Sequence, residues 1–188
     1  MIYTLEHIKN IENLQTYAQF ISTNFGASVV FESDLAETNG KVIKVPSVNC
    51  FSDEVVDYIY AIILHEAGHI KYTDFSEDLF KKVKSENMFT LFNFVEDGHI
   101  EKRIIKDFTG GFQTLLPIYS DKMIKNGEFI SVASLPKVRD PFFIIGSYIR
   151  QKMTGLGNFE DCLSAKTAST IKAYIKKINL HKTIIYKD

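Results

Sequence analysis

Residues 62–70 read Ile62-Ile63-Leu64-His65-Glu66-Ala67-Gly68-His69-Ile70, so two histidines stand four positions apart with a glutamate directly after the first. Residues four apart lie on the same face of a helix, and the His65 and His69 rings can therefore bind one metal ion while Glu66 lies beside it. Neutral imidazoles are good ligands for Zn²⁺, and a glutamate next to a zinc-bound water can accept its proton during peptide hydrolysis. The stretch predicts a zinc site with Glu66 as general base.

The surrounding sequence has the pattern of a long helix. Apolar residues recur at helical spacing from Val55 to Ile70, Ser52 is a suitable N-cap, and Thr73-Asp74 ends the pattern. Without a metal, two imidazoles and a carboxylate would lie in an apolar helix without partners, which is costly in free energy. This cost favours metal binding over the alternative that these are ordinary helix residues.

A catalytic zinc site needs a third protein ligand and one open position for water, so a second helix should supply another side chain. The sequence predicts this helix over about residues 86–108, before Gly110-Gly111. On a helical projection of 100° per residue, three apolar residues lie within about 40° of Glu96: Phe89, Phe92 and Ile100. A carboxylate centred on an apolar face needs a strong partner, and we therefore expect Glu96 to be the third ligand.

Neighbouring polar residues are candidates for supporting roles. Asp97 lies about 100° from Glu96 and remains the alternative ligand, because the opposite face of the helix is apolar too. Asn93 and Asp97 could orient the ligands, and His99 could donate a hydrogen bond at the site or lie at its rim. Glu101, about 140° from Glu96, is expected to face solvent.

The two motifs together resemble a known family. His65-Glu66-Ala67-Gly68-His69, followed by Asn93-Phe94-Val95-Glu96-Asp97-Gly98-His99-Ile100-Glu101, is similar to zincin metallopeptidases of the gluzincin type. More narrowly, it resembles predicted metallopeptidase domains of phage and bacterial proteins, which are often joined to a von Willebrand factor A-like domain. The resemblance covers roughly residues 29–119 and implies His65, His69 and Glu96 as zinc ligands with Glu66 as base. The family usually has an arginine where Gly98-His99 stands here.

Composition limits the other functions. With 188 residues, 45% hydrophobic and 24% charged, the chain can bury a sizeable core. A net charge of −1 argues against nucleic-acid binding, and no apolar run is long enough to span a membrane. Two cysteines, Cys50 and Cys162, and no signal-peptide pattern indicate a cytoplasmic protein, in the host cytoplasm if it is phage-encoded.

The rest of the chain completes an α+β, predominantly helical prediction. Two strands of a small sheet are expected over residues 27–31 and 41–45, and an edge strand near the metal could bind an extended peptide. Further helices are predicted over residues 5–25, 77–84, 140–149 and 167–178. We expect one peptidase domain, with a zincin core over 1–125 and a helical extension over 126–188 packed on it.

The predicted function is zinc-dependent hydrolysis of a polypeptide by an endopeptidase. The second electrophile at the oxyanion stays open among four residues: Tyr72, His99, Arg103 and Tyr119. The alternative is a non-catalytic module in which the metal stabilises the fold and the cleft binds a peptide without cutting it. The sequence leaves the natural substrate and the oligomeric state open.

Overall fold

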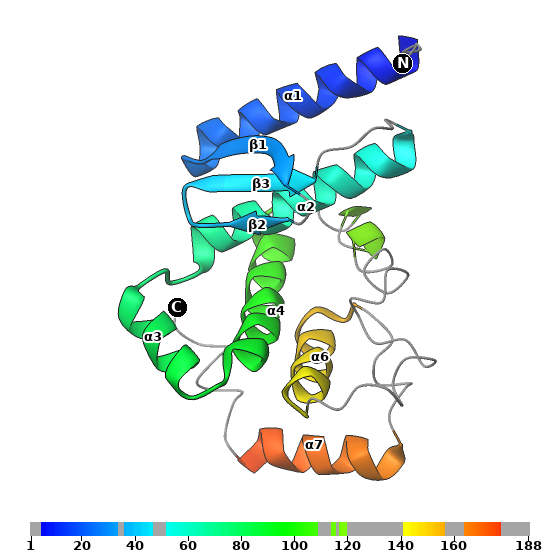
Figure 1. Cartoon of the computed structure of the whole chain (residues 1–188). Helices are drawn as coiled ribbons and strands as arrows, with labels where there is room; N and C mark the ends of the chain where they lie inside the picture. Colours follow the sequence, from blue (N-terminus) through cyan, green and yellow to red (C-terminus); the bar gives the residue numbers. More distant parts are fainter. Residues whose placement is uncertain are drawn as a thin grey trace.

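Helices make up most of this structure, a computed structural model that describes residues 5–33, 36–46, 52–108, 114–115, 117–119, 141–156 and 164–177. In chain order the elements are α1 (Leu5–Phe25), β1 (Ser28–Ser33), β2 (Glu37–Thr38), β3 (Val42–Pro46), α2 (Asp53–Tyr72), α3 (Glu77–Ser85), α4 (Phe89–Asp107), α6 (Pro141–Thr154) and α7 (Ala165–Lys177) (Figure 1). The structure is predominantly helical and has a small sheet, which confirms the predicted α+β class. The proposed boundary between residues 125 and 126 lies outside the described residues.

The sheet has three strands in the order β1-β3-β2, one more than the sequence predicted. β1 pairs with β3 in parallel, from Ser28 opposite Val42, whereas β2 pairs with β3 antiparallel. The Asn39 side chain accepts hydrogen bonds from the N–H groups of Lys41 and Val42, which fixes the turn between β2 and β3. The Asn39-Gly40 turn therefore joins β2 to β3, and β2 is an edge strand that lies, along the chain, between the two strands predicted from the sequence.

The core lies between the sheet and the first two long helices. Ile43 and Val45 on alternate positions of β3 are fully buried, while the residues between them are only partly covered. They join a cluster with Ile21 of α1 and with Ile59 and Ile63 of α2. In Figure 1 the sheet lies beside α1 and overlaps α2, and both helices contact its strands as well as each other. Packing against the core thus holds α2 in place.

The helix boundaries follow local sequence signals. α2 begins after Ser52, in the N-cap position, and ends before Thr73, as predicted. α4 begins at Phe89 rather than near residue 86, because α3 extends to Ser85 and a turn with Asn87 at φ +54° separates the two helices. Among the described helices, none is both long and apolar enough to cross a membrane.

Two glycines allow the helices around the histidines to approach closely. A Cβ atom at Gly68 of α2 would lie 2.1 Å from Ile104 Cδ1 of α4, and a Cβ atom at Gly98 of α4 would lie 3.2 Å from the Cα atom of Arg150 in α6. α4 therefore packs against α2 on one side and against α6 on another (Figure 1). Small residues at both crossings bring polar side chains from three helices together.

We expect Gly68→Ala to destabilise the fold by about 1–3 kcal/mol through overpacking against Ile104, despite the higher helix propensity of alanine. Ile104→Val removes the Cδ1 atom and alone should cost about 0.5–1.5 kcal/mol. Chemical denaturation of the single and double variants measures the coupling. The double variant should be about as stable as Ile104→Val, and strict additivity would contradict the proposed contact.

Candidate metal centre

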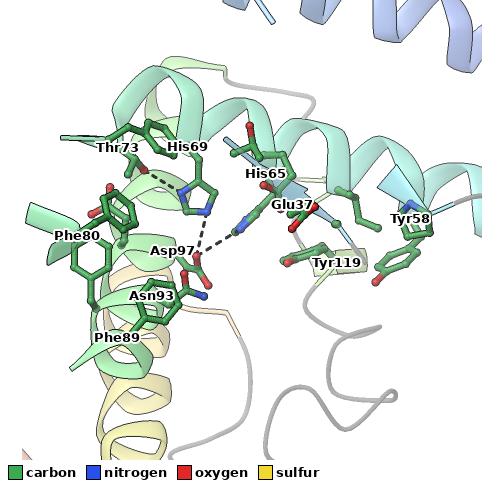
Figure 2. A pocket seen from close by; sticks show the side chains of 18 residues that line it. Glu37, Tyr58, His65, His69, Thr73, Phe80, Phe89, Asn93, Asp97 and Tyr119 are labelled. Carbon is green, nitrogen blue, oxygen red and sulfur yellow. Dashed lines mark hydrogen bonds and ion pairs between the residues drawn. The ribbon is translucent and has the colours of Figure 1, made fainter. Parts of the chain in front are cut away.

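His65, His69 and Asp97 bring three potential ligand atoms together between α2 and α4. One ligand atom from each residue lies within 4.8 Å of the others. Asp97 Oδ1 is 3.2 Å from His69 Nε2 and 3.7 Å from His65 Nε2, and both contacts are drawn in Figure 2. The imidazole rings come from positions one helical turn apart and lie edge to face, with centroids 5.0 Å apart. The three side chains thus converge on one point.

Each imidazole has a separate partner on its other nitrogen. His69 Nδ1 is 2.9 Å from the Thr73 hydroxyl, one turn further along α2 (Figure 2). His65 Nδ1 is buried and lies 3.1 Å from Glu101 Oε1, off the direction of a straight hydrogen bond. Such contacts fix ring orientation at metal sites. They leave both Nε2 atoms directed toward Asp97.

Two carboxylates of α4, those of Asp97 and Glu101, share a buried arginine from α6. Arg150 Nη1 donates to Asp97 Oδ2 at 2.7 Å, and Arg150 Nε donates to Glu101 Oε2 at 3.0 Å. Its Nη2 donates to Glu101 Oε1. Asp97, Glu101 and Arg150 are only 6%, 2% and 6% exposed. Buried charges require such compensation, which explains how two acids are accommodated on the buried face of α4.

The local charges shift several pKa values. Burial opposes protonation of His65, but Asp97 and Glu101 outweigh it and raise the pKa of His65 to about 10. Burial also opposes ionisation of Asp97, yet Arg150 and the two imidazoles hold the pKa of Asp97 well below its ordinary value. Because an imidazole must be neutral to bind a metal, cation binding at this site is expected to release protons.

Glu66 lies beside the triad with a different environment. It is 8% exposed and lines the same cavity as the two histidines. Burial raises the pKa of Glu66 above the ordinary carboxyl value, although the two imidazoles act in the opposite direction. A general base works best when its pKa is close to the operating pH, so this shift suits proton transfer near neutrality.

The structure places Asp97, rather than Glu96, where the sequence predicted the third ligand. Glu96 and Asn93 line the cavity, but neither belongs to the group of converging ligand atoms among the described residues. His99 lies beside Glu96, with Nδ1 3.7 Å from its Oε2, rather than at the triad. The apolar face used for the ranking combines Ile100, which is fully buried, with Phe89, which is 45% exposed, so it coincides only in part with the buried face.

Glu101 was wrongly expected to face solvent. The buried face of α4 consists of Asp97, Gly98, Ile100, Glu101 and Ile104. The sequence prediction also missed Arg150, which neutralises this face from 49 and 53 residues away. Thr73 was read only as the end of a helix, although its position four residues after His69 is the signal that it could contact that ring.

The triad opens into a cavity of about 590 Å³. Its described walls are formed by the edge strand β2, by α2 and α4, and by aromatic side chains, some of which are visible in Figure 2. Of the four electrophile candidates, Tyr119 is the one among the described cavity-lining residues, and its ring lies against His65 with centroids 4.8 Å apart. Burial raises the pKa of Tyr119 well above its ordinary value, so the phenol stays protonated.

The other candidates have different surroundings. The Tyr72 hydroxyl donates to Asp107 Oδ2 at 2.6 Å, and the Arg103 guanidinium lies over the Tyr72 ring. Neither residue is among those that line the cavity. Tyr119 is therefore the candidate that lines the same cavity as the triad and contacts His65.

The donor set fits a divalent cation. Ligand atoms bound tetrahedrally to zinc at about 2.0–2.1 Å lie roughly 3.3 Å from one another, close to the two distances measured from Asp97 Oδ1. Two imidazole nitrogens and a carboxylate oxygen are common ligands in catalytic zinc sites. His65, His69 and Asp97 could therefore hold a metal ion.

Comparisons of the chain with family models and curated proteins, and of its fold with solved structures, gave no match. The interpretation of the site consequently rests on its geometry and on the residue motifs.

Proposed function

We propose that this protein is a zinc-dependent peptidase, with His65, His69 and Asp97 as metal ligands and Glu66 as general base. The observation that carries this proposal is the approach of Asp97 Oδ1 to both imidazoles at the wall of a cavity that Glu66 also lines. The crossing of α2 and α4 beside a small sheet supports a zincin-like arrangement of the same site.

The side chains have separable chemical roles in this proposal. Bound zinc would acidify a water molecule and polarise the scissile carbonyl group. Glu66 takes the proton from the attacking water and passes it to the leaving amine. Tyr119, which stays protonated, donates a hydrogen bond to the carbonyl oxygen as negative charge develops there. His65 and His69 would bind the metal as neutral imidazoles after losing any proton they carry, and their orientation depends on Glu101 and Thr73.

The cavity walls support a polypeptide substrate. β2 is an edge strand, and Glu37 and Thr38 of this strand line the cavity, so an extended chain could pair with its free backbone groups. Another part of the wall is aromatic, where the Phe80 ring centroid lies 5.7 Å from that of Phe92 and 6.2 Å from that of Phe75. Such a surface suits apolar side chains of an unfolded chain.

Metal analysis combined with a cleavage assay tests the proposal. The purified protein should contain about one zinc ion per chain and cleave an unstructured protein, and chelation should stop cleavage until zinc is restored. Mass spectrometry of the products would identify new termini. Bound zinc without cleavage, together with unfolding on chelation, would contradict the peptidase and favour a metal-stabilised binding module. Absence of metal binding would contradict both functions.

A further inference from the structure

Arg150 connects the candidate ligands to a third helix. It belongs to α6, is 6% exposed, and reaches between Asp97 and Glu101, which lie one turn apart on α4. All three guanidinium nitrogens donate hydrogen bonds: Nη1 donates to Asp97, and Nε and Nη2 donate to the two oxygens of Glu101. A planar fork with this geometry holds two carboxylates at a fixed distance and orientation.

The contact with Asp97 determines which of its oxygens is available. Oδ2 accepts the 2.7 Å hydrogen bond from Arg150, whereas Oδ1 lies near the Nε2 atoms of His65 and His69. A carboxylate with one oxygen held in this way presents only the other oxygen to a metal. Single-oxygen binding leaves a coordination position for water, which a catalytic site requires.

Through its contact with Glu101, Arg150 also affects the orientation of His65. Both oxygens of Glu101 are held by Arg150, and Oε1 is also 3.1 Å from His65 Nδ1. A fixed carboxylate beside Nδ1 orients the imidazole ring and directs Nε2 toward the metal. Arg150 therefore acts on two of the three candidate ligands, on one directly and on the other through Glu101.

We propose that Arg150 is a positioning residue that makes Asp97 a single-oxygen ligand and, through Glu101, orients His65. This inference rests on the proposed metal site formed by His65, His69 and Asp97. Gly98 belongs to the same arrangement, because a side chain there would lie against the Arg150 backbone and separate α6 from α4. Lysine in place of Arg150 would retain the charge but has no planar fork for two carboxylates.

The test compares Arg150→Met and Arg150→Lys with wild type by zinc affinity, by the absorption spectrum of the cobalt(II)-substituted protein, and by thermal stability. Lys152→Met is the control, because Lys152 is an exposed residue of the same helix. We expect Arg150→Met to lower zinc affinity by about 10–100-fold or more. The cobalt spectrum should also change, because its intensity and shape depend on coordination geometry. Lysine should restore part of the affinity without restoring the spectrum.

The two measurements separate positioning from a general effect on folding. Destabilised Arg150 variants that bind zinc with wild-type affinity and show the wild-type cobalt spectrum would overturn the inference. If Arg150→Met does not fold, Arg150→Lys decides by the same criteria, since it keeps the buried charge. A wild-type protein that binds no metal would instead refute the proposed function. Neither measurement requires peptide cleavage, so the two failures are distinguishable.

Discussion

Glu66→Gln is expected to bind zinc as the wild-type protein does and to lose at least about 10²–10⁴-fold of its peptidase activity. Glutamine has nearly the same shape as glutamate but does not accept a proton from the attacking water. Glu66 does not belong to the group His65, His69 and Asp97 whose ligand atoms converge. Its replacement should therefore leave the zinc affinity unchanged. Zinc content and the initial rate of cleavage of a fluorogenic peptide, measured on the same preparation, check both expectations.

Glu37→Gln provides a matched control for this experiment. Glu37 also lines the cavity, but it belongs to β2 and its carboxylate binds Lys44 at 2.9 Å. It should retain most of the activity, because a peptide would pair with the backbone of β2 rather than with this side chain, which is bound to Lys44. Wild-type activity in Glu66→Gln would refute the role of Glu66 as base. Equal losses of activity in both variants would indicate that activity depends on the total charge of the cavity rather than on Glu66 itself.

Asp97→Ala is expected to show the largest loss of metal affinity among single changes on α4, larger than the roughly 10–100-fold typical for residues that only support a ligand. The change removes a candidate ligand and also leaves Arg150 without one of its two buried partners. Equilibrium dialysis or a competing chelator measures the zinc affinity. Activity should fall in parallel, because the base Glu66 then lacks an activated water.

Glu96→Ala is the matched variant, one residue earlier on the same helix. Glu96 lines the cavity and its oxygen lies 3.7 Å from His99 Nδ1, outside the converging group. Zinc affinity should therefore stay within a few-fold of wild type. Full zinc occupancy in Asp97→Ala together with an empty site in Glu96→Ala would show that the sequence-based choice of ligand was right and the geometric choice wrong.

The sequence predicted α2 well because independent signals agree there. Ser52 precedes the helix, acidic residues occupy its first turn, and apolar positions recur until Thr73. The same helix carries His65 and His69, whose spacing alone requires that they share a face. Local information was sufficient for the two histidines and for the placement of Glu66 beside them.

The sequence named Asp97 only as the alternative to Glu96, because local reasoning could not rank the two correctly. A helical projection identifies the buried face only when one face is apolar, and α4 has apolar residues on both sides. The buried face instead carries two acids, Asp97 and Glu101, which Arg150 neutralises from a distant part of the chain. The sequence predicted the strands β1 and β3 but missed the edge strand β2, because its two residues, Glu37 and Thr38, are too few to form an alternating pattern and only the turn at Asn39 is encoded locally.

The buried charges around the triad also bear on the charge of the cation that the proposed site would bind. Glu66, Asp97 and Glu101, when ionised, carry three negative charges and Arg150 carries one positive charge, so with neutral imidazoles the formal sum is −2. A dication brings this region to neutrality, whereas Na⁺ or K⁺ would leave an unbalanced charge where solvation is poor. Charge balance at the proposed site would thus favour a divalent cation over the abundant monovalent ions before ligand geometry distinguishes one divalent metal from another.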